Sequence, residues 1–342
     1  MMDDLLERIH GCLVGLAIGD AWGMPGQASP EGTRELHGKI TAFLEPPADD
    51  PIHGGLKAGQ VTDDTLAALA IVRSIIRTGH VVVEDVARSL VEWIDEVNGL
   101  NLSYVGPSTK RAIIQLKEGV PPEESGRWGW SNGAAMRIAP VGFLYPGEIE
   151  ATVEAVTKVS LPTHGTNTAI SGAAAVACAV TQCAISRSTI TDVVEAAKRG
   201  ADLGEKRGYP YPCPSISRRI TFALELVSAD KGIEERQRDL YDLIGTGLAS
   251  YEVVPTAIAL FALAQGEPME TITLTANTGG DCDTLAAIAG AIAGAFKGVS
   301  AFPPQHIRFV EQVNDLDLKK IATDYLSAIE ALHSEPKPET PV

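Results

Sequence analysis

Glycine recurs every four residues in two apolar segments near opposite ends of the chain. The first ladder is Gly11, Gly15, Gly19 and Gly23, and the second is Gly290, Gly294 and Gly298. Residues four apart share one face of an α-helix, so each ladder predicts a helix with a stripe that lacks side chains. Each glycine lowers helix propensity by on the order of 1 kcal/mol, and close packing of another backbone would offset this cost. We expect both helices inside a soluble core, because Asp20 and its polar neighbours disfavour a membrane dimerisation helix.

The composition also favours helices. The sequence is 45% hydrophobic but only 5% aromatic, and much of its apolar content is alanine, the residue with the highest helix propensity. Helical periodicity recurs along the chain, and strand-like alternation is scarce. The periodic segments are residues 4–19, 64–78, 84–97, 108–117, 148–157, 167–184, 190–201, 215–227, 235–247, 254–264, 268–275, 284–296 and 317–331. We therefore predict an all-α fold.

Segments rich in proline and glycine interrupt this pattern at residues 45–59, 119–133, 204–214 and 297–305. A length of 342 residues is compatible with two domains, but none of these segments is typical of a domain linker. The C-terminal sequence SEPKPETPV is polar and rich in proline, so we predict a disordered tail over residues 333–342.

Charge and cysteine content limit the class of protein. The formal net charge of -16, without a local cluster of lysines and arginines, disfavours nucleic acid as a partner. The 5 cysteines form no C-x-x-C spacing, which disfavours a disulfide framework and a zinc–thiolate site and indicates a reducing compartment. The first residues, MMDDLLERIH, are acidic where a signal peptide is basic, and no apolar run reaches the roughly 18–20 residues of a membrane span. We predict a soluble, cytoplasmic protein with no membrane partner.

Two short acidic segments lie far apart in the sequence and are nearly the same. VTDDTLAALA contains D-D-T-L-A-A, and NTGGDCDTLAAI contains D-x-D-T-L-A-A. Taken alone, the first is explained by a helix that Thr62 caps, with Asp63 and Asp64 in the first turn, where negative charge complements the helix dipole. A cap alone does not explain the second, because Asp281 and Asp283 are two residues apart and do not share a helical face.

The second acidic segment also follows two glycines. Gly279 and Gly280 free the backbone to turn Asp281 and Asp283 toward a common point with the first acidic pair. Carboxylates gathered in this way would repel one another and raise each other's pKa, and a hard divalent cation would relieve the repulsion. Carboxylate and hydroxyl oxygens suit Mg²⁺, Mn²⁺ or Ca²⁺, in a pair about 3.5–4 Å apart, better than zinc. An EF-hand loop, a Walker A loop and a G-x-G-x-x-G fingerprint are absent from the sequence.

These segments and several others, in the same order, resemble the ADP-ribosylglycohydrolase family. The resemblance extends from about residue 8 to 300 and includes GCLVGLAIGDAWGMP, VTDDT, YVGPST, SNGAAMRIAPVG, THGTNTAISGA and ANTGGDCDTLAAIAGAIAGAFKG. It implies an all-α, single-domain orthogonal multi-helix bundle, which we assign to residues 1–332, with a central cleft that holds two Mg²⁺ ions. Asp20, in the first motif, could reach this site or hydrogen-bond the turn that follows it. By motif position, the implied metal ligands are Thr62, Asp63, Asp64, Asp281, Asp283 and Thr284.

The resemblance also implies hydrolysis of the ribosyl glycosidic bond of ADP-ribosylated substrates. The metal ions would orient the ribose diol and activate water, and Asp63, Asp64 or Asp283 could accept the proton. Family members often carry a catalytic glutamate where this chain has Gln27, which can hydrogen-bond a hydroxyl group but cannot act as a general base near neutral pH. Tyr104 likewise stands where bacterial members often have aspartate. Three functions remain open: an ADP-ribosyl hydrolase, a hydrolase of smaller N-ribosyl or nucleoside-like compounds, and a catalytically impaired ADP-ribose-binding protein.

The substrate is expected at loops of small residues. The SNGAAMR loop could offer backbone N–H groups to phosphate or ribose oxygens, and a tight turn that fills the core is the alternative. His164 could contact the substrate or hold a neighbouring loop. We prefer Tyr211 to Trp128, Trp130 and Tyr209 as the aromatic residue that stacks on a base. The predicted substrate contacts are Ser131, Asn132, Gly133, Met136, His164 and Tyr211.

Overall fold

The computed structural model of this chain describes residues 2–26 and 29–334. Within these ranges the fold is all-helical, and the strand-like pairing consists of two isolated bridges, Ser131–Ala249 and Thr166–Tyr209. The predicted all-α class is therefore confirmed.

The α-helices differ widely in length, and short 3-10 or π segments connect some of them. The α-helices are α1 (Met2–Gly23), α2 (Pro30–His37), α3 (Asp63–Thr78), α4 (Val83–Glu96), α5 (Pro107–Lys117), α6 (Pro122–Ser125), α7 (Ile149–Ser160), α8 (Asn167–Cys183), α9 (Ile190–Gly204), α10 (Ile216–Ser228), α11 (Ile233–Asp239), α12 (Ser250–Leu263), α13 (Pro268–Ala276), α14 (Cys282–Lys297), α15 (Pro304–Asn314) and α16 (Leu318–Ser334). The 3-10 helices are η1 (Gly99–Asn101), η2 (Asn132–Ala134), η3 (Ala139–Phe143) and η5 (Val299–Ala301), and η4 (Leu240–Ile244) is a π-helix.

Every segment with predicted helical periodicity overlaps at least one helix of the structure. Helices α2, α6 and α15 were not predicted. Helix α2 has the polar sequence PEGTRELH and is too short to show an apolar stripe. It begins because Pro30 occupies the first turn and Ser29 Oγ accepts a hydrogen bond from Gly32 N at 3.2 Å. Helix α15 begins at Pro304, inside a segment predicted as a break, since the fixed φ of proline suits the first helical turn.

The ends of two elements also differ from the prediction. Residues 235–247 are not one helix, because the π-helix η4 ends at Gly245, whose φ of 94° only glycine adopts readily. Helix α16 continues through Ser334, past the predicted end of the domain at residue 332, and His333 Nε2 lies 2.8 Å from the carbonyl oxygen of Leu144. The remaining residues of the predicted tail, 335–342, lie outside the described residues.

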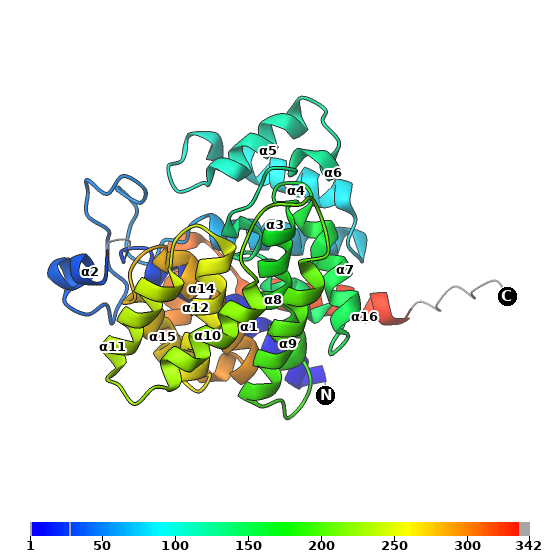
Figure 1. The fold of residues 1–342 in the computed structure, drawn as a ribbon. Helices are drawn as coiled ribbons and strands as arrows, with labels where there is room; N and C mark the ends of the chain where they lie inside the picture. Colours follow the sequence, from blue (N-terminus) through cyan, green and yellow to red (C-terminus); the bar gives the residue numbers. More distant parts are fainter. Residues whose placement is uncertain (1, 27–28, 335–342) are drawn as a thin grey trace.

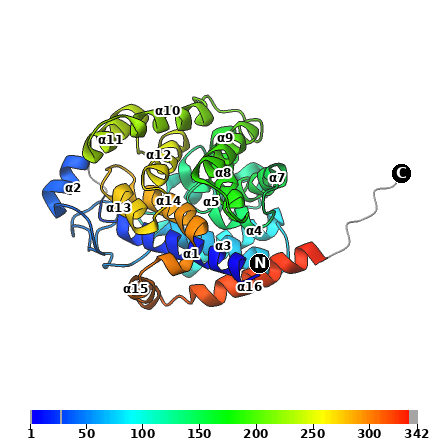
Figure 2. The same ribbon diagram turned by 90° about the horizontal axis from the view of Figure 1, so that it is seen from below.

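The two glycine ladders pack against each other. Helices α1 and α14 run antiparallel and side by side through the centre of the molecule (Figures 1 and 2). A Cβ atom on Gly15 would lie 2.1 Å from the carbonyl oxygen of Gly290, and one on Gly294 would lie 1.9 Å from that of Gly11. Real Cβ atoms do not approach a backbone so closely, so glycine is required along this contact.

The antiparallel ladder brings the C-terminal end of α1 to the N-terminal end of α14. A Cβ atom on Gly23 would lie 2.2 Å from the carbonyl oxygen of Cys282, the first residue of α14. Asp20 on α1 is therefore held near the second acidic segment. Helices α8, α12 and α13 pack around the pair, and α3 and α16 contact α1 as well. Nearly every residue of α8 and α14 is buried, which makes these two helices the centre of the core.

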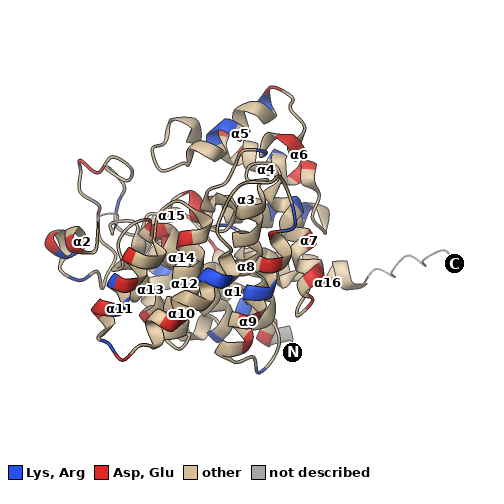
Figure 3. Cartoon of the chain, in the orientation of Figure 1, with Lys and Arg blue, Asp and Glu red and all other residues tan. Residues whose placement is uncertain are grey.

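Charged residues of both signs are spread over the described helices (Figure 3). In Figure 3 the lysines and arginines alternate with acidic residues along the helices, and most of the ion pairs are exposed, as in Arg73–Glu96 and Arg199–Glu150. Exposed pairs of this kind contribute little to stability. Among the described helices, none combines the length and the apolar character needed to cross a membrane. All 5 cysteines are free thiols.

The ladder contact yields a stability prediction. Gly15→Ala should lower the free energy of unfolding by about 1–3 kcal/mol, because the added methyl group forces the α1 and α14 backbones apart. Gly232→Ala is the matched control, since a Cβ atom there would meet only Glu235 Oε2 at 3.9 Å, and its effect should stay within about 0.5 kcal/mol. Urea unfolding of both variants measures the difference, and an unchanged or more stable Gly15→Ala protein would show that the backbones are not in contact.

Candidate active site

The two acidic segments both lie at helix N-termini. Asp63 and Asp64 open helix α3, and Thr62 precedes them as the cap, with its side chain 3.4 Å from the N–H of Asp64. Asp281 caps helix α14. At α3 the Thr62 hydroxyl accepts an N–H group that the helix leaves unpaired, whereas the Asp281 side chain makes no such cap hydrogen bond to α14.

Two glycines turn the chain into α14. Gly279 and Gly280 have φ values of 85° and 83°, in the left-handed region that glycine favours. The N–H of Asp281 then donates to the carbonyl oxygen of Thr246 at 2.8 Å. A Cβ atom on Gly280 would lie 2.1 Å from Thr246 Oγ1, so this loop also depends on a missing side chain. The turn directs the side chains of Asp281 and Asp283 toward α3.

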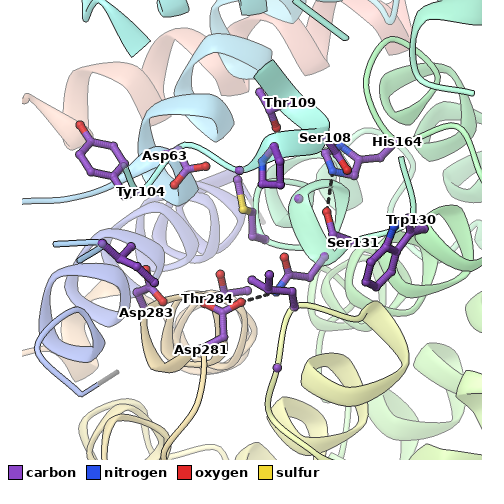
Figure 4. A pocket seen from close by; sticks show the side chains of 18 of the residues that line it. Asp63, Tyr104, Ser108, Thr109, Trp130, Ser131, His164, Asp281, Asp283 and Thr284 are labelled. Carbon is purple, nitrogen blue, oxygen red and sulfur yellow. Dashed lines mark hydrogen bonds between the residues drawn. The ribbon is translucent and has the colours of Figure 1, made fainter. Parts of the chain in front are cut away.

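The structure brings the two acidic segments together. Thr284 Oγ1 donates to Asp64 Oδ1 at 3.1 Å, across a separation of 220 residues in the sequence. The carboxylate of Asp283 is close enough to Asp63 and Asp64 to raise the pKa of both. Figure 4 shows Asp63 on one side of a cavity and Asp281, Asp283 and Thr284 on the opposite side.

Burial and mutual repulsion act strongly on these carboxylates. Asp63 and Asp64 are 6% and 1% exposed. Burial, followed by the charges of Asp283 and Asp20, raises the pKa of Asp63 to about 7. Burial and Asp283 also raise the pKa of Asp64 and of the half-buried Asp281 well above the usual range. The neighbouring charges with the largest effect on Asp64 are all carboxylates.

The pKa of Asp283 is lowered, unlike that of the neighbouring carboxylates, and the imidazole of His53 lies beside it. Burial is the largest single effect on Asp283 and opposes its ionisation, but the charge and hydrogen bond of His53, with hydrogen bonds from Asp281 and the Thr284 backbone, together lower the pKa of Asp283 to about 2. His53 Nε2 lies 3.0 Å from Asp283 Oδ2, and the imidazole is fully buried. Its ring stacks on Tyr104, with centroids 6.4 Å apart. The N–H of His53 donates to Asp50 Oδ1 at 2.7 Å, which holds the histidine in the loop between α2 and α3.

Sequence reasoning did not identify His53 as part of the site. The histidine lies in a segment predicted only as a Pro/Gly-rich break, and no motif marks it. The one local signal is Asp50, whose carboxylate also accepts the N–H of Ile52 at 2.8 Å and so forms a side-chain-capped turn. Such a turn predicts a local bend in the chain, but it does not predict that the His53 side chain is buried.

The open part of the site is a cavity of about 470 Å³. Of the predicted metal ligands, Asp63, Asp281, Asp283 and Thr284 line it, whereas Thr62 and Asp64 lie behind them. The start of helix α5 forms another wall, which sequence reasoning left without a role. That wall consists of Tyr104, Gly106, Pro107, Ser108, Thr109 and Arg111.

The SNGAAMR loop lies at the cavity, as predicted for substrate contact. Asn132 Nδ2 donates to Asp281 Oδ2 at 2.6 Å and thereby orients this carboxylate. Ser131 Oγ lies 3.0 Å from His164 Nε2, and a Cβ atom on Gly133 would lie 2.5 Å from the same imidazole. Ser131, Asn132, Gly133, Met136 and His164 all line the cavity.

His164 is buried and uncharged. Burial, together with the nearby Arg137 charge, lowers the pKa of His164 well below its usual range. Its Nδ1 lies 2.9 Å from Thr163 Oγ1, so both ring nitrogens contact hydroxyl groups. The imidazole therefore supports the Ser131 loop while one edge of it faces the cavity.

Tyr211, the preferred stacking residue, lies against Trp130, and its role with a base stays a prediction. Trp130 lines the cavity, whereas Tyr211 is not among the described lining residues. Tyr211 instead stacks on Trp130, with ring centroids 5.9 Å apart and planes at 6°. Its N–H donates to Asn167 Oδ1 at 2.8 Å, which holds the tyrosine behind the tryptophan. A ligand base would meet Trp130 first, and Tyr211 would support that ring. Gln27 lies outside the described residues.

The donor set suits a hard cation. Carboxylates and hydroxyl groups are the oxygen ligands that Mg²⁺, Mn²⁺ and Ca²⁺ prefer, and several of them are buried here close to one another. In the described part of the chain, no group of three or more His, Cys, Asp or Glu side chains is already closed around one ion position. The carboxylates bind protein donors instead, as Asp281 binds Asn132 and Asp64 binds Thr284. A metal ion would take over part of these interactions.

Comparisons with known proteins place this arrangement in a family. A family model described as ADP-ribosylglycohydrolase matches residues 1–336. The chain is 34% identical to "Uncharacterized protein YegU" of Escherichia coli (strain K12), covering 93% of this chain and 96% of that protein. It is 26% identical to "ADP-ribosylhydrolase ARH3" of Bos taurus, covering 92% of this chain and 91% of that protein.

A solved structure with the same fold supports this assignment. The "ADP-ribosylglycohydrolase-related protein complex" superimposes with a TM-score of 0.69 at 23% sequence identity, covering 96% of this chain and 99% of that chain. At this level of identity the match shows the fold alone, which agrees with the single all-helical core seen here. The family model over residues 1–336 shows that the chain belongs to the ADP-ribosylglycohydrolase family.

Proposed function

We propose that this protein is a Mg²⁺-dependent hydrolase that cleaves the ribosyl glycosidic bond of ADP-ribosylated substrates at a two-metal site. The observation that carries the proposal is the convergence of two helix N-termini, 220 residues apart, whose carboxylates face each other across one cavity. Family membership supports a hydrolase acting on ADP-ribose linkages.

The residues divide into those that would hold metal and those that would face substrate. Thr62 and Asp64 lie behind the cavity wall, and hydrogen bonds link Asp64 to Thr62 and to the cavity-lining Thr284, which suits ligands that must stay fixed. Asp63 and Asp283 line the cavity and would serve both metal and substrate. When bound, the divalent ions would supply Lewis acidity, which lowers the pKa of a water molecule and orients the ribose diol. Mn²⁺ or Ca²⁺ could occupy the same oxygen ligands.

The chemistry requires one water molecule for each bond cleaved. The hydroxyl group of water adds to the anomeric carbon, the bond from that carbon to the leaving group breaks, and the leaving group gains a proton. Asp63 suits the first proton transfer, because its carboxylate faces the cavity. Ser131 and Asn132 would orient the substrate from the opposite wall.

A second candidate is hydrolysis of a smaller N-ribosyl or nucleoside-like compound. Arg111 is the single lysine or arginine among the described residues that line the cavity, whereas the diphosphate of ADP-ribose carries two negative charges. Ile52, Tyr104, Trp130 and Leu248 give the same cavity an apolar and aromatic part that suits a nucleobase.

An assay across substrate classes tests the function. With Mg²⁺, the protein should release ADP-ribose from a modified protein side chain, and excess EDTA should abolish this activity. Asp63→Asn and Asp283→Asn should each lower kcat/KM at least about 100-fold, because each removes a charged ligand or proton acceptor. Asp202→Asn, a change at an exposed position on α9, is the control and should leave the rate unchanged.

The alternatives give different results in the same assay. Metal-dependent release of a free base from nucleosides, without release of ADP-ribose, would select the second candidate. Tight ADP-ribose binding with no turnover of any substrate would leave a binding protein. Full activity in EDTA, or in Asp283→Asn, would contradict the proposed metal centre.

The buried carboxylates also predict how stability depends on pH in the metal-free protein. The pKa of Asp63 is raised from 3.8 to about 7 in the folded state, so the folded protein holds this proton more tightly than the unfolded chain. The associated stabilisation is present at low pH and is lost as the pH rises through about 7. Asparagine mimics the protonated acid, so Asp63→Asn should gain Tm relative to the natural chain between pH 5 and pH 8 in EDTA.

Differential scanning calorimetry across that pH range measures the effect. Asp202→Asn should show no such pH-dependent gain, since Asp202 is exposed. Addition of Mg²⁺ should raise the Tm of the natural chain at pH 8 more than that of Asp63→Asn, because the ion takes over the role of the proton. A constant difference in Tm between Asp63→Asn and the natural chain across the range would be inconsistent with repulsion at Asp63.

A further inference from the structure

Asp20 is a fully buried carboxylate on α1 whose hydrogen bonds lead to the first acidic segment. Its Oδ1 accepts from Thr62 Oγ1 at 2.9 Å, and its Oδ2 accepts from Thr65 Oγ1 at 2.6 Å. The N–H groups of Thr62 and Thr65 also donate to Oδ2, at 3.0 and 3.1 Å. Of the two roles left open by the sequence, the structure favours the one in which Asp20 reaches the site.

We propose that Asp20 and Thr65 form a positioning pair that fixes the first turn of α3 and thereby sets the metal affinity of the site. This inference rests on the proposed function. Neither residue lines the cavity or is a proposed metal ligand. Thr62 and Thr65 both donate to Asp20, and Asp63 and Asp64 lie between them at the start of α3. The pair therefore acts on the position of these neighbours.

The hydrogen-bond geometry explains why Asp20 positions other residues and does not itself bind metal. A carboxylate offers about four acceptor positions, and four donor groups from Thr62 and Thr65 already occupy them. Two of these donors are N–H groups at the start of α3, which a helix leaves unpaired. The cap that Thr62 provides is weak by comparison, at 3.4 Å to the N–H of Asp64. Asp20 therefore acts as an external cap for α3.

Helix α1 connects this cap to the other half of the site. Asp20 lies between Gly19 and Gly23, whose Cβ atoms would lie 2.1 Å from Ala286 O and 2.2 Å from Cys282 O at the start of α14. One rigid helix thus contacts the start of α14 through its glycines and the start of α3 through Asp20. Asp63 and Asp283 repel each other when ionised, so a fixed first turn would hold Asp63 in place against this repulsion.

Thr65 provides the sharpest test, because its side-chain hydroxyl donates to Asp20 and has no proposed role with metal or substrate. Thr65→Val and Thr65→Ala remove this donor, and Thr65→Ser retains it. We expect Thr65→Val and Thr65→Ala to weaken Mn²⁺ binding about 10–100-fold, as is typical when a residue that supports metal ligands is lost. Thr65→Ser should bind Mn²⁺ within about 2-fold of the natural chain.

Mn²⁺ titration followed by EPR, with Mg²⁺ competition, measures these affinities, and calorimetry in EDTA measures Tm. Either hydroxyl-free variant suffices if the other fails to fold. A purely structural role would lower Tm in EDTA while leaving the Mn²⁺ dissociation constant at its natural value, and this result would overturn the inference. If the natural chain itself bound no Mn²⁺ or Mg²⁺, this result would contradict both the proposed metal centre and the positioning role of Asp20 and Thr65. If the natural chain bound the ions and Thr65→Val and Thr65→Ala bound them with the same affinity, only the positioning role of Asp20 and Thr65 would be contradicted.

Discussion

Direct contact between the backbones of α1 and α14 determines where the candidate active site forms. The carbonyl oxygens of Gly11 and Gly15 occupy the space that side chains on Gly294 and Gly290 would need, so the observed register depends on these glycines. That register places Asp20 beside the start of α14. Because Asp20 also accepts the N–H groups at the start of α3, the same helix sets the position of both acidic segments.

The consequence is an electrostatically unfavourable cluster inside a tightly packed core. Asp20, Asp63 and Asp64 are buried, and each has a raised pKa in the absence of metal. Their burial and mutual repulsion lower the free energy of unfolding, so stability alone does not explain why they are gathered here. In a member of the ADP-ribosylglycohydrolase family, the same cost is consistent with a site that divalent ions complete.

The sequence predicted the parts of the structure that depend on local patterns. The glycine ladders and the repeated acidic helix starts identified α1, α3 and α14, because four-residue spacing and capping residues act within one helix. His53 could not be predicted, since its burial against Asp283 depends on how a loop without a motif folds over the site. The sequence likewise did not show that Trp130 lies between Tyr211 and the cavity, because that order depends on how two loops fold against each other.

The central claim is that the two acidic segments form one divalent metal centre. Anomalous diffraction from crystals of the natural chain grown with Mn²⁺ tests it most directly. The account predicts anomalous peaks between the carboxylates of Asp63 and Asp283, with Asp64 and Asp281 turned from their present hydrogen-bond partners toward the ions. A well-ordered map in which these carboxylates keep their protein partners, and in which no Mn²⁺ peak lies within coordination distance of either helix start, would contradict it.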